Sequence, residues 1–102
     1  MIDISVVDTG DPLEIRIRGS ITFATAEELH QSLLRALPKQ GSLRVILEEL
    51  QEFDLTGVQL LYSLCRTGES AGIAIEVVLG DAAPRFERML RFAGLAPIPC
   101  AV

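Results

Sequence analysis

The chain has 102 residues, 49% of them hydrophobic, and 14 acidic against 9 basic residues give it a net charge of −5. This length suits a single domain over residues 1–102, and so apolar a composition excludes a disordered chain. The scarcity of Lys and Arg argues against a nucleic-acid partner, and apolar runs of only a few residues argue against direct membrane insertion.

The first twenty residues predict two strands joined by a turn. Residues 1–4 lack the basic start and apolar block of a signal peptide, so a cytosolic protein is expected. Apolar and polar residues alternate over 2–7 and again over 13–17, which is the period of a strand with one buried face. The Thr-Gly-Asp-Pro segment at 9–12 is a turn signal, and Gly19 is expected to close the second strand. The two strands are therefore predicted to pair antiparallel.

An amphipathic helix is predicted over residues 24–37. Thr25 and Glu28 have the spacing of a capping box, which places the helix start near Thr25. Pro38 and the glycine that follows end the helix. The lone histidine, His30, lies on its polar side and is expected on the surface.

The second half of the chain alternates strands with helices. Residues 48–52 are expected to form an acidic connector after a strand that is buried on both faces. The resulting order is β-β-α-β-α-β-α with a possible final strand, so the fold class is α/β, a mixed sheet with helices packed on it. The expected elements are strands over 43–47 and 73–79, helices over 56–69 and 84–93, and a candidate edge strand over 98–102.

No group of residues is typical of a catalytic or metal centre, so neither enzymatic activity nor a cofactor is predicted. Cys65 and Cys100 are too few and too isolated to indicate a disulfide framework or a zinc site, and Cys65 is expected as a small core residue. Arg85, Arg88 and Arg91 recur every third residue. They form either a solvated helix face or a basic stripe that faces a partner.

The segment 53–57, Phe-Asp-Leu-Thr-Gly, is the best candidate for a binding site because it joins a strand to the start of a helix. Asp54 is placed to cap that helix. Free N–H groups and the positive end of the helix dipole would also favour an anion there. A nucleotide-binding protein is the weaker alternative, since no Gly-rich loop followed by Lys is present.

Three segments of the sequence resemble the STAS family of anti-sigma factor antagonists and sulfate-transporter cytoplasmic domains. Residues 18–27 look like the exit from the family's second strand, and residues 53–58 look like its D-S-S/T-G loop. Residues 86–95, which end in RFAGL, are similar to its closing helix. The resemblance covers nearly the whole chain in the expected order and implies a STAS-like fold and a non-enzymatic protein-binding module.

The resemblance also implies a partner and a switch. Anti-sigma factor antagonists dock this loop and the next helix onto a histidine-kinase-like ATPase, which phosphorylates the first hydroxyl residue of the loop and so abolishes docking. That position is Leu55 here, which has no hydroxyl. Thr56 either stabilises the first helical turn or has become the phospho-acceptor. Leu55 is either an exposed partner anchor or part of the core, and Thr22 replaces an acidic residue of the family.

The predicted partner-binding surface combines this loop with the next helix and the exit of the second strand. Gly57 is expected to let the backbone approach the partner closely. The expected partner is a serine kinase that acts as an anti-sigma factor, or another histidine-kinase-like ATPase or sensor, in bacterial signalling. The alternative is a small STAS subunit of a lipid or anion ABC transporter complex, and a homodimer is left open. The surface residues are Asp54, Leu55, Thr56, Gly57, Gln59, Ser63, Arg66, Ser20 and Thr22.

Overall fold

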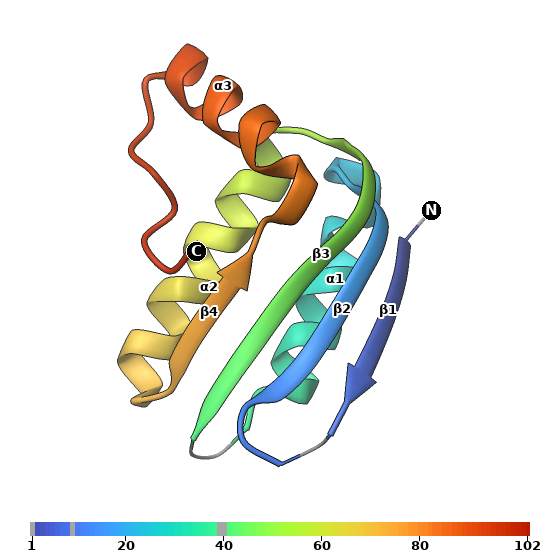
Figure 1. Cartoon of the computed structure of the whole chain (residues 1–102), viewed down its shortest axis with the longest axis vertical. Helices are drawn as coiled ribbons and strands as arrows, with labels where there is room; N and C mark the ends of the chain where they lie inside the picture. The colour runs from blue at the N-terminus through green and yellow to red at the C-terminus, as the bar shows by residue number, and fades with distance from the viewer. Residues whose placement is uncertain (1, 9, 39–40) are drawn as a thin grey trace.

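The backbone follows the predicted order of strands and helices (Figure 1). The computed structural model describes residues 2–8, 10–38 and 41–102. None of the helices in these ranges is long and apolar enough to cross a membrane. The elements are β1 (Ile2–Val7), β2 (Leu13–Ile21), α1 (Phe23–Ala36), β3 (Ser42–Phe53), α2 (Leu55–Ala71), β4 (Ala74–Val78), the 3-10 turn η1 (Gly80–Ala82) and α3 (Ala83–Ala93).

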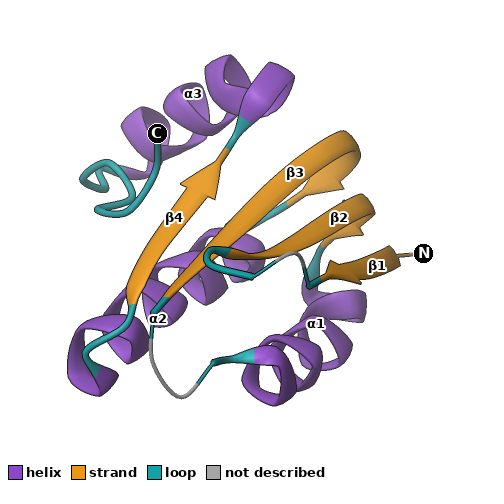
Figure 2. Cartoon of the chain, turned by 60° about the horizontal axis from the view of Figure 1, so that its bottom comes forward, coloured by secondary structure: helices purple, strands orange, loops and turns teal. Residues whose placement is uncertain are grey.

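The four strands form one mixed sheet in the order β1-β2-β3-β4, which confirms the predicted fold class. β1 runs antiparallel to β2, whereas β2, β3 and β4 are parallel to one another. Figure 2 shows α1 and α2 on the same side of the sheet, with α3 beyond the end of β4. The core lies between the sheet and these helices, and its fully buried members include Ile15, Ile17, Leu29, Val45, Leu61 and Val77.

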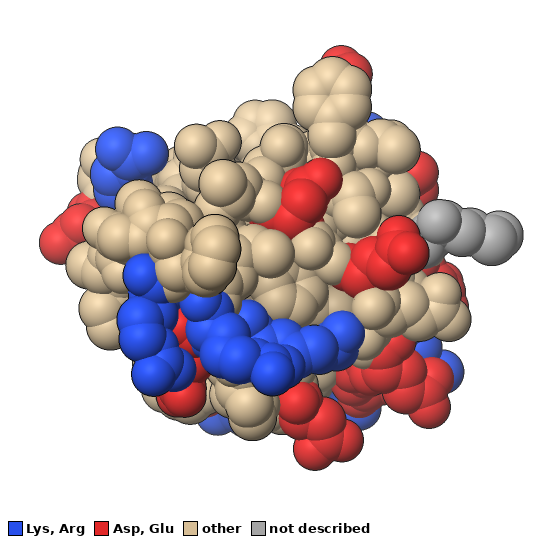
Figure 3. Space-filling model, turned by 90° about the horizontal axis from the view of Figure 1, so that it is seen from above, with Lys and Arg blue, Asp and Glu red and all other residues tan. Residues whose placement is uncertain are grey.

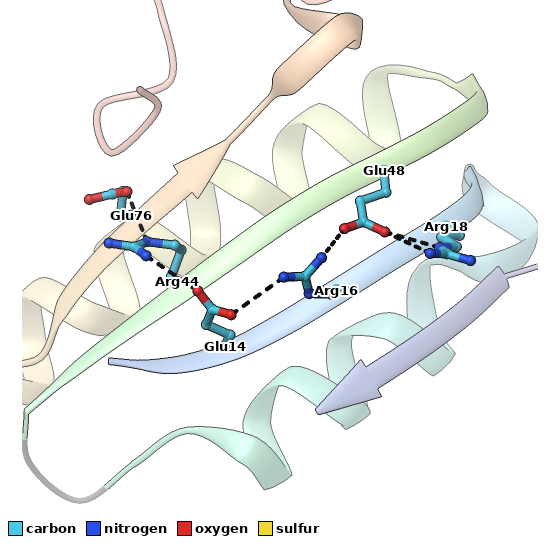
Figure 4. Close-up of polar contacts among 6 residues, drawn as sticks. All are labelled: Glu14, Arg16, Arg18, Arg44, Glu48 and Glu76. Carbon is cyan, nitrogen blue, oxygen red and sulfur yellow. Dashed lines mark hydrogen bonds and ion pairs between the residues drawn. The ribbon is translucent and has the colours of Figure 1, made fainter. Parts of the chain in front are cut away.

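The other face of the sheet carries charged side chains, so the prediction that residues 43–47 are buried on both faces is wrong. Arg44 of β3 lies between Glu76 of β4, at 3.1 Å, and Glu14 of β2, at 3.3 Å. Glu48 pairs with Arg16 and with Arg18 (Figure 4). We call this set the charge ladder: Glu14, Arg16, Arg18, Arg44, Glu48 and Glu76.

The ion pairs of the charge ladder shift the pKa values of two of its members, Glu48 and Arg18. A hydrogen bond from Arg18, with Arg16 beside it, holds the pKa of Glu48 below its ordinary value. The same hydrogen bond and the nearby negative charge raise the pKa of Arg18. The ladder thus keeps alternate charges paired across three strands on the face of the sheet that water reaches.

β3 is longer than its apolar pattern predicts. It continues to Phe53, so the acidic connector expected over residues 48–52 is wrong, and β2 likewise runs two residues past Gly19. The pairing register shifts on both sides of Gly19, which lies opposite Leu50. The extra residue Glu49 has a φ of 46°, in the left-handed region that a bulge can require. These irregularities break the polar alternation without ending the strand.

The C-terminal segment after α3 returns to the outer edge of β4. Val77 N–H donates to the carbonyl of Cys100 at 2.8 Å, and Val102 N–H donates to the carbonyl of Val77 at 2.9 Å. The candidate edge strand is therefore reduced to a single bridge between Val77 and Ala101. Cys65 lies in the core as predicted, but it forms a disulfide with Cys100. The interpretation that the two cysteines are too isolated to indicate a disulfide is wrong, because this returning segment brings them together.

Candidate functional site

The predicted docking loop is built around Asp54, whose carboxylate caps two helices. Its Oδ1 accepts a hydrogen bond from Gly57 N–H at 3.2 Å, in the first turn of α2. Its Oδ2 accepts one from Phe23 N–H at 3.0 Å, at the start of α1. The backbone N–H of Asp54 donates to the carbonyl of Ile21 at 3.3 Å. The prediction that Asp54 caps the second helix is confirmed, and the same side chain also fixes the first.

The start of α1 differs from the prediction. Phe23 is its first residue and Thr22 occupies the cap position, so a capping box formed by Thr25 and Glu28 is wrong. Thr25 is instead the third residue of the helix, and its hydroxyl accepts a hydrogen bond from Thr22 N–H at 3.0 Å. The hydroxyl also donates to the carbonyl of Ser20 at 2.7 Å. Thr25 thus accepts the hydrogen bond from the N–H of the cap residue, which a Glu or Gln at this helix position more often accepts.

Two of the predicted contact residues lie inside the protein. Ser20 is buried at the end of β2. Gly57 is also buried, and a Cβ added there would lie 2.5 Å from the carbonyl oxygen of Ile21. Its lack of a side chain therefore allows α2 to pack against β2, so the expectation that Gly57 brings the backbone close to a partner is not supported.

The other predicted contact residues lie nearer the surface. Leu55 is 45% exposed at the first position of α2, so it does not belong to the core. Thr56 and Thr22 are half-buried. Among the described residues no hydrogen bond is made by the Thr56 hydroxyl, and the capping role belongs to Asp54. Along α2, Gln59 and Arg66 are exposed and Ser63 is half-buried.

A groove of about 840 Å³ opens beside Leu55, and we call it the tip groove. One wall is the end of β3 with the following loop, residues 51–55, and the other wall is α3. Below them the rings of Phe53 and Phe86 stack with their centroids 4.0 Å apart. No residue of α3 is among the predicted contact residues, because Phe92, its outward aromatic residue, falls outside the apolar stripe of the helix. The α3 residues that line the groove are Arg85, Arg88, Met89, Phe92 and Ala93.

The three arginines of α3 do not form the uniform stripe that either sequence interpretation describes, because Arg85 contacts β3. Arg85 donates to the carbonyls of Leu50 and Gln51 and lies 5.6 Å from the ring centre of Phe53, so it fastens α3 to β3. Arg88 and Arg91 are exposed, and neither forms an ion pair within residues 2–8, 10–38 and 41–102. Figure 3 shows Arg side chains as a band across this end of the molecule, beside a broad area in which most side chains are uncharged.

The start of α2 is a poorer anion site than its sequence indicates. Asp54 already accepts from Gly57 N–H, and its backbone carbonyl accepts from Val58 N–H at 3.1 Å. The Asp54 carboxylate also places a negative charge at the positive end of the helix dipole, where a phosphate would otherwise be favoured. The start of α2 therefore offers a phosphate fewer free N–H groups and a less positive site than the sequence indicates.

The chain matches one family model over nearly its full length. The family is described as "Mlab, STAS domain", and the match covers residues 4–99. No curated protein matches the sequence. The matched range includes the whole sheet apart from the first two residues of β1, all three helices, the segment 53–57 and the tip groove. The chain belongs to the STAS domain family.

Proposed function

We propose that this protein is a non-enzymatic STAS-type docking module that binds a protein partner through Leu55 and the outer face of α2. The observation that carries the proposal is the exposed leucine at the first position of α2. It follows Asp54, whose carboxylate accepts hydrogen bonds from the first turns of both α1 and α2. Binding sites between proteins concentrate their affinity in a few apolar anchors on preorganised supports. Gln59, Ser63 and Arg66 supply polar contacts around this anchor.

The docking is constitutive with respect to phosphorylation at position 55, because leucine cannot accept a phosphate. Thr56 is the remaining hydroxyl of the loop. A phosphate on Thr56 would add about −1.5 to −2 charges next to the Asp54 carboxylate, and the half-buried side chain restricts access for a kinase. Incubation with a candidate kinase followed by intact mass measurement tests this part; a stoichiometric phosphate on Thr56 would overturn it.

The partner that fits best is a histidine-kinase-like ATPase or a sensor in a bacterial signalling module, as for anti-sigma factor antagonists. A second candidate is an ATP-binding subunit of a lipid or anion transporter, with this chain as its small STAS subunit. The same Leu55 favours that candidate, since a permanent apolar anchor suits a lasting assembly. Nucleotide binding by the chain itself is disfavoured by the capped start of α2.

The proposal includes a cytosolic location. The disulfide between Cys65 and Cys100 is the structural feature that tests this location. Disulfides persist mainly in oxidising compartments, whereas cytosolic thiols are kept reduced. Cys65 is buried and Cys100 is half-buried, so reductants reach the bond with difficulty. Alkylation of free thiols in intact cells, followed by mass measurement of the purified chain, reports which state prevails.

The test of docking compares two exposed apolar residues. Leu55→Asp places a charge at the proposed anchor, and Val6→Asp is the matched control because Val6 is 54% exposed on the edge strand β1. We expect both variants to remain folded by circular dichroism. Partner capture from the native cell should fall by about tenfold or more for Leu55→Asp alone. A folded Leu55→Asp variant that captures the same partner as the wild type would refute the docking proposal.

A further inference from the structure

One surface of the molecule carries both the tip groove and a protruding aromatic side chain, Phe92, that could fill such a groove. Phe92 is 96% exposed on α3, although it is among the residues that line the groove. Phe23, at the start of α1 on the same end of the molecule, is also largely exposed. Large aromatic side chains gain much from burial, and exposed apolar patches mark interaction surfaces.

The two walls of the tip groove carry opposite charges. Arg88 lies on the α3 wall, and Glu52 lies on the wall formed by the end of β3. Both residues are exposed, and neither forms an ion pair in the described part of the chain. A two-fold axis that runs along such a groove places the basic wall of one copy against the acidic wall of the other. Surfaces that pair in this way are self-complementary, as a symmetric dimer interface must be.

We propose that the tip groove is a homodimer interface, in which Phe92 of each copy enters the groove of the other and Arg88 of each copy faces Glu52 of the other. A second copy fits this groove better than an anionic membrane or an acidic peptide does. An anionic membrane or an acidic peptide would meet Glu52 and Asp54 as well as the arginines of α3, whereas a second copy presents both signs of charge in the matching places. The inference does not require the proposed docking, although Leu55 lines the same groove.

Sedimentation over a range of concentrations tests the dimer. The mass of the wild type should rise from 11.1 kDa toward twice that value, and Phe92→Ala should raise the dissociation constant by about tenfold or more. A wild-type protein that stays monomeric up to about 1 mM overturns the proposal, because such an interface would be too weak to be specific. A monomer that binds phosphatidylglycerol vesicles through Phe92 would assign the groove to lipid and overturn it too.

A charge exchange tests the arrangement of the two copies. Arg88→Glu and Glu52→Arg should each be monomeric alone, since each places like charges together twice across the axis. An equal mixture of the two variants should form a heterodimer, because both contacts are then attractive. Arg35→Glu and Glu69→Arg are matched controls, because these residues lie near the C-terminal ends of α1 and α2, away from the tip groove. Both control variants should dimerise as the wild type does. Failure of the mixture to pair would overturn the geometry, while partner capture through Leu55 would remain a separate result.

Discussion

Replacing Asp54 with alanine tests the double cap on which the site is built. Loss of an N-cap side chain costs about 1 kcal/mol of stability. The second hydrogen bond, from Phe23 N–H at 3.0 Å, also involves a charged acceptor, and a half-exposed bond of this kind adds about 1 kcal/mol more. We therefore expect Asp54→Ala to lower the free energy of unfolding by about 2 kcal/mol and the Tm by about 8–16 °C.

Urea unfolding followed by circular dichroism measures this loss, with an unchanged m-value showing that only stability has changed. Asp54→Asn should lose about half as much, because an amide has one acceptor oxygen and can serve only one of the two N–H groups. Asp81→Ala, at an exposed aspartate in η1, should change stability by less than about 0.5 kcal/mol. An Asp54→Ala variant as stable as the Asp81 control would refute the double cap.

Three further predictions concern the packing at Gly57, the pH dependence of stability and the reduction of the disulfide. Gly57→Ala should cost about 3 kcal/mol in urea unfolding, at the upper end for overpacking, because its Cβ would lie 2.5 Å from the Ile21 carbonyl oxygen; an unchanged midpoint would contradict the close approach. Since Arg18 lowers the pKa of Glu48 in the folded state, the stabilisation is fully present above pH 4.5, the ordinary pKa, and is lost as the pH falls through the lowered value. Glu48→Gln should therefore flatten the stability profile below pH 4.5 only, and an equal slope in both proteins would count against the charge ladder. Reducing the disulfide should lower stability by about 2–4 kcal/mol, and equal unfolding curves with and without dithiothreitol would show that it contributes nothing.

The order of elements could be predicted because the apolar residues of each helix and strand recur with the period of that element. The stripe over residues 56–69 predicts α2 to within two residues at either end. The end of β3 could not be predicted in this way. Its last residues depend on an irregular register with β2, where the bulge at Glu49 removes the alternation that identifies a strand. Leu50 and Phe53 are three positions apart, which does not fit the two-residue period of a strand, because a second register shift skips Gln51.

The site was predicted less completely than the fold because it depends on contacts between distant residues. Asp54 and Phe23 are 31 positions apart, and their hydrogen bond fixes which way the loop faces. No local pattern could decide whether Leu55 points outward or into the core. The α3 wall was missed for the same reason, since Arg85 reaches β3 across 34 and 35 positions. Local sequence shows that a helix has a free face but not which neighbour that face meets.

In the proposed docking, Leu55 cannot be phosphorylated, and the proposed self-association would supply another way to prevent binding. Leu55 lines the tip groove, so a dimer formed there covers the anchor that the partner needs. At a chain concentration ten times the dimer dissociation constant, about one fifth of the chains are monomeric, and the apparent affinity for the partner falls about fivefold. A titration of labelled partner at low and high chain concentration measures this factor. The Arg88→Glu variant, which cannot pair with itself, should show the same affinity at both concentrations, and a fivefold loss that persists in this variant would disprove the competition.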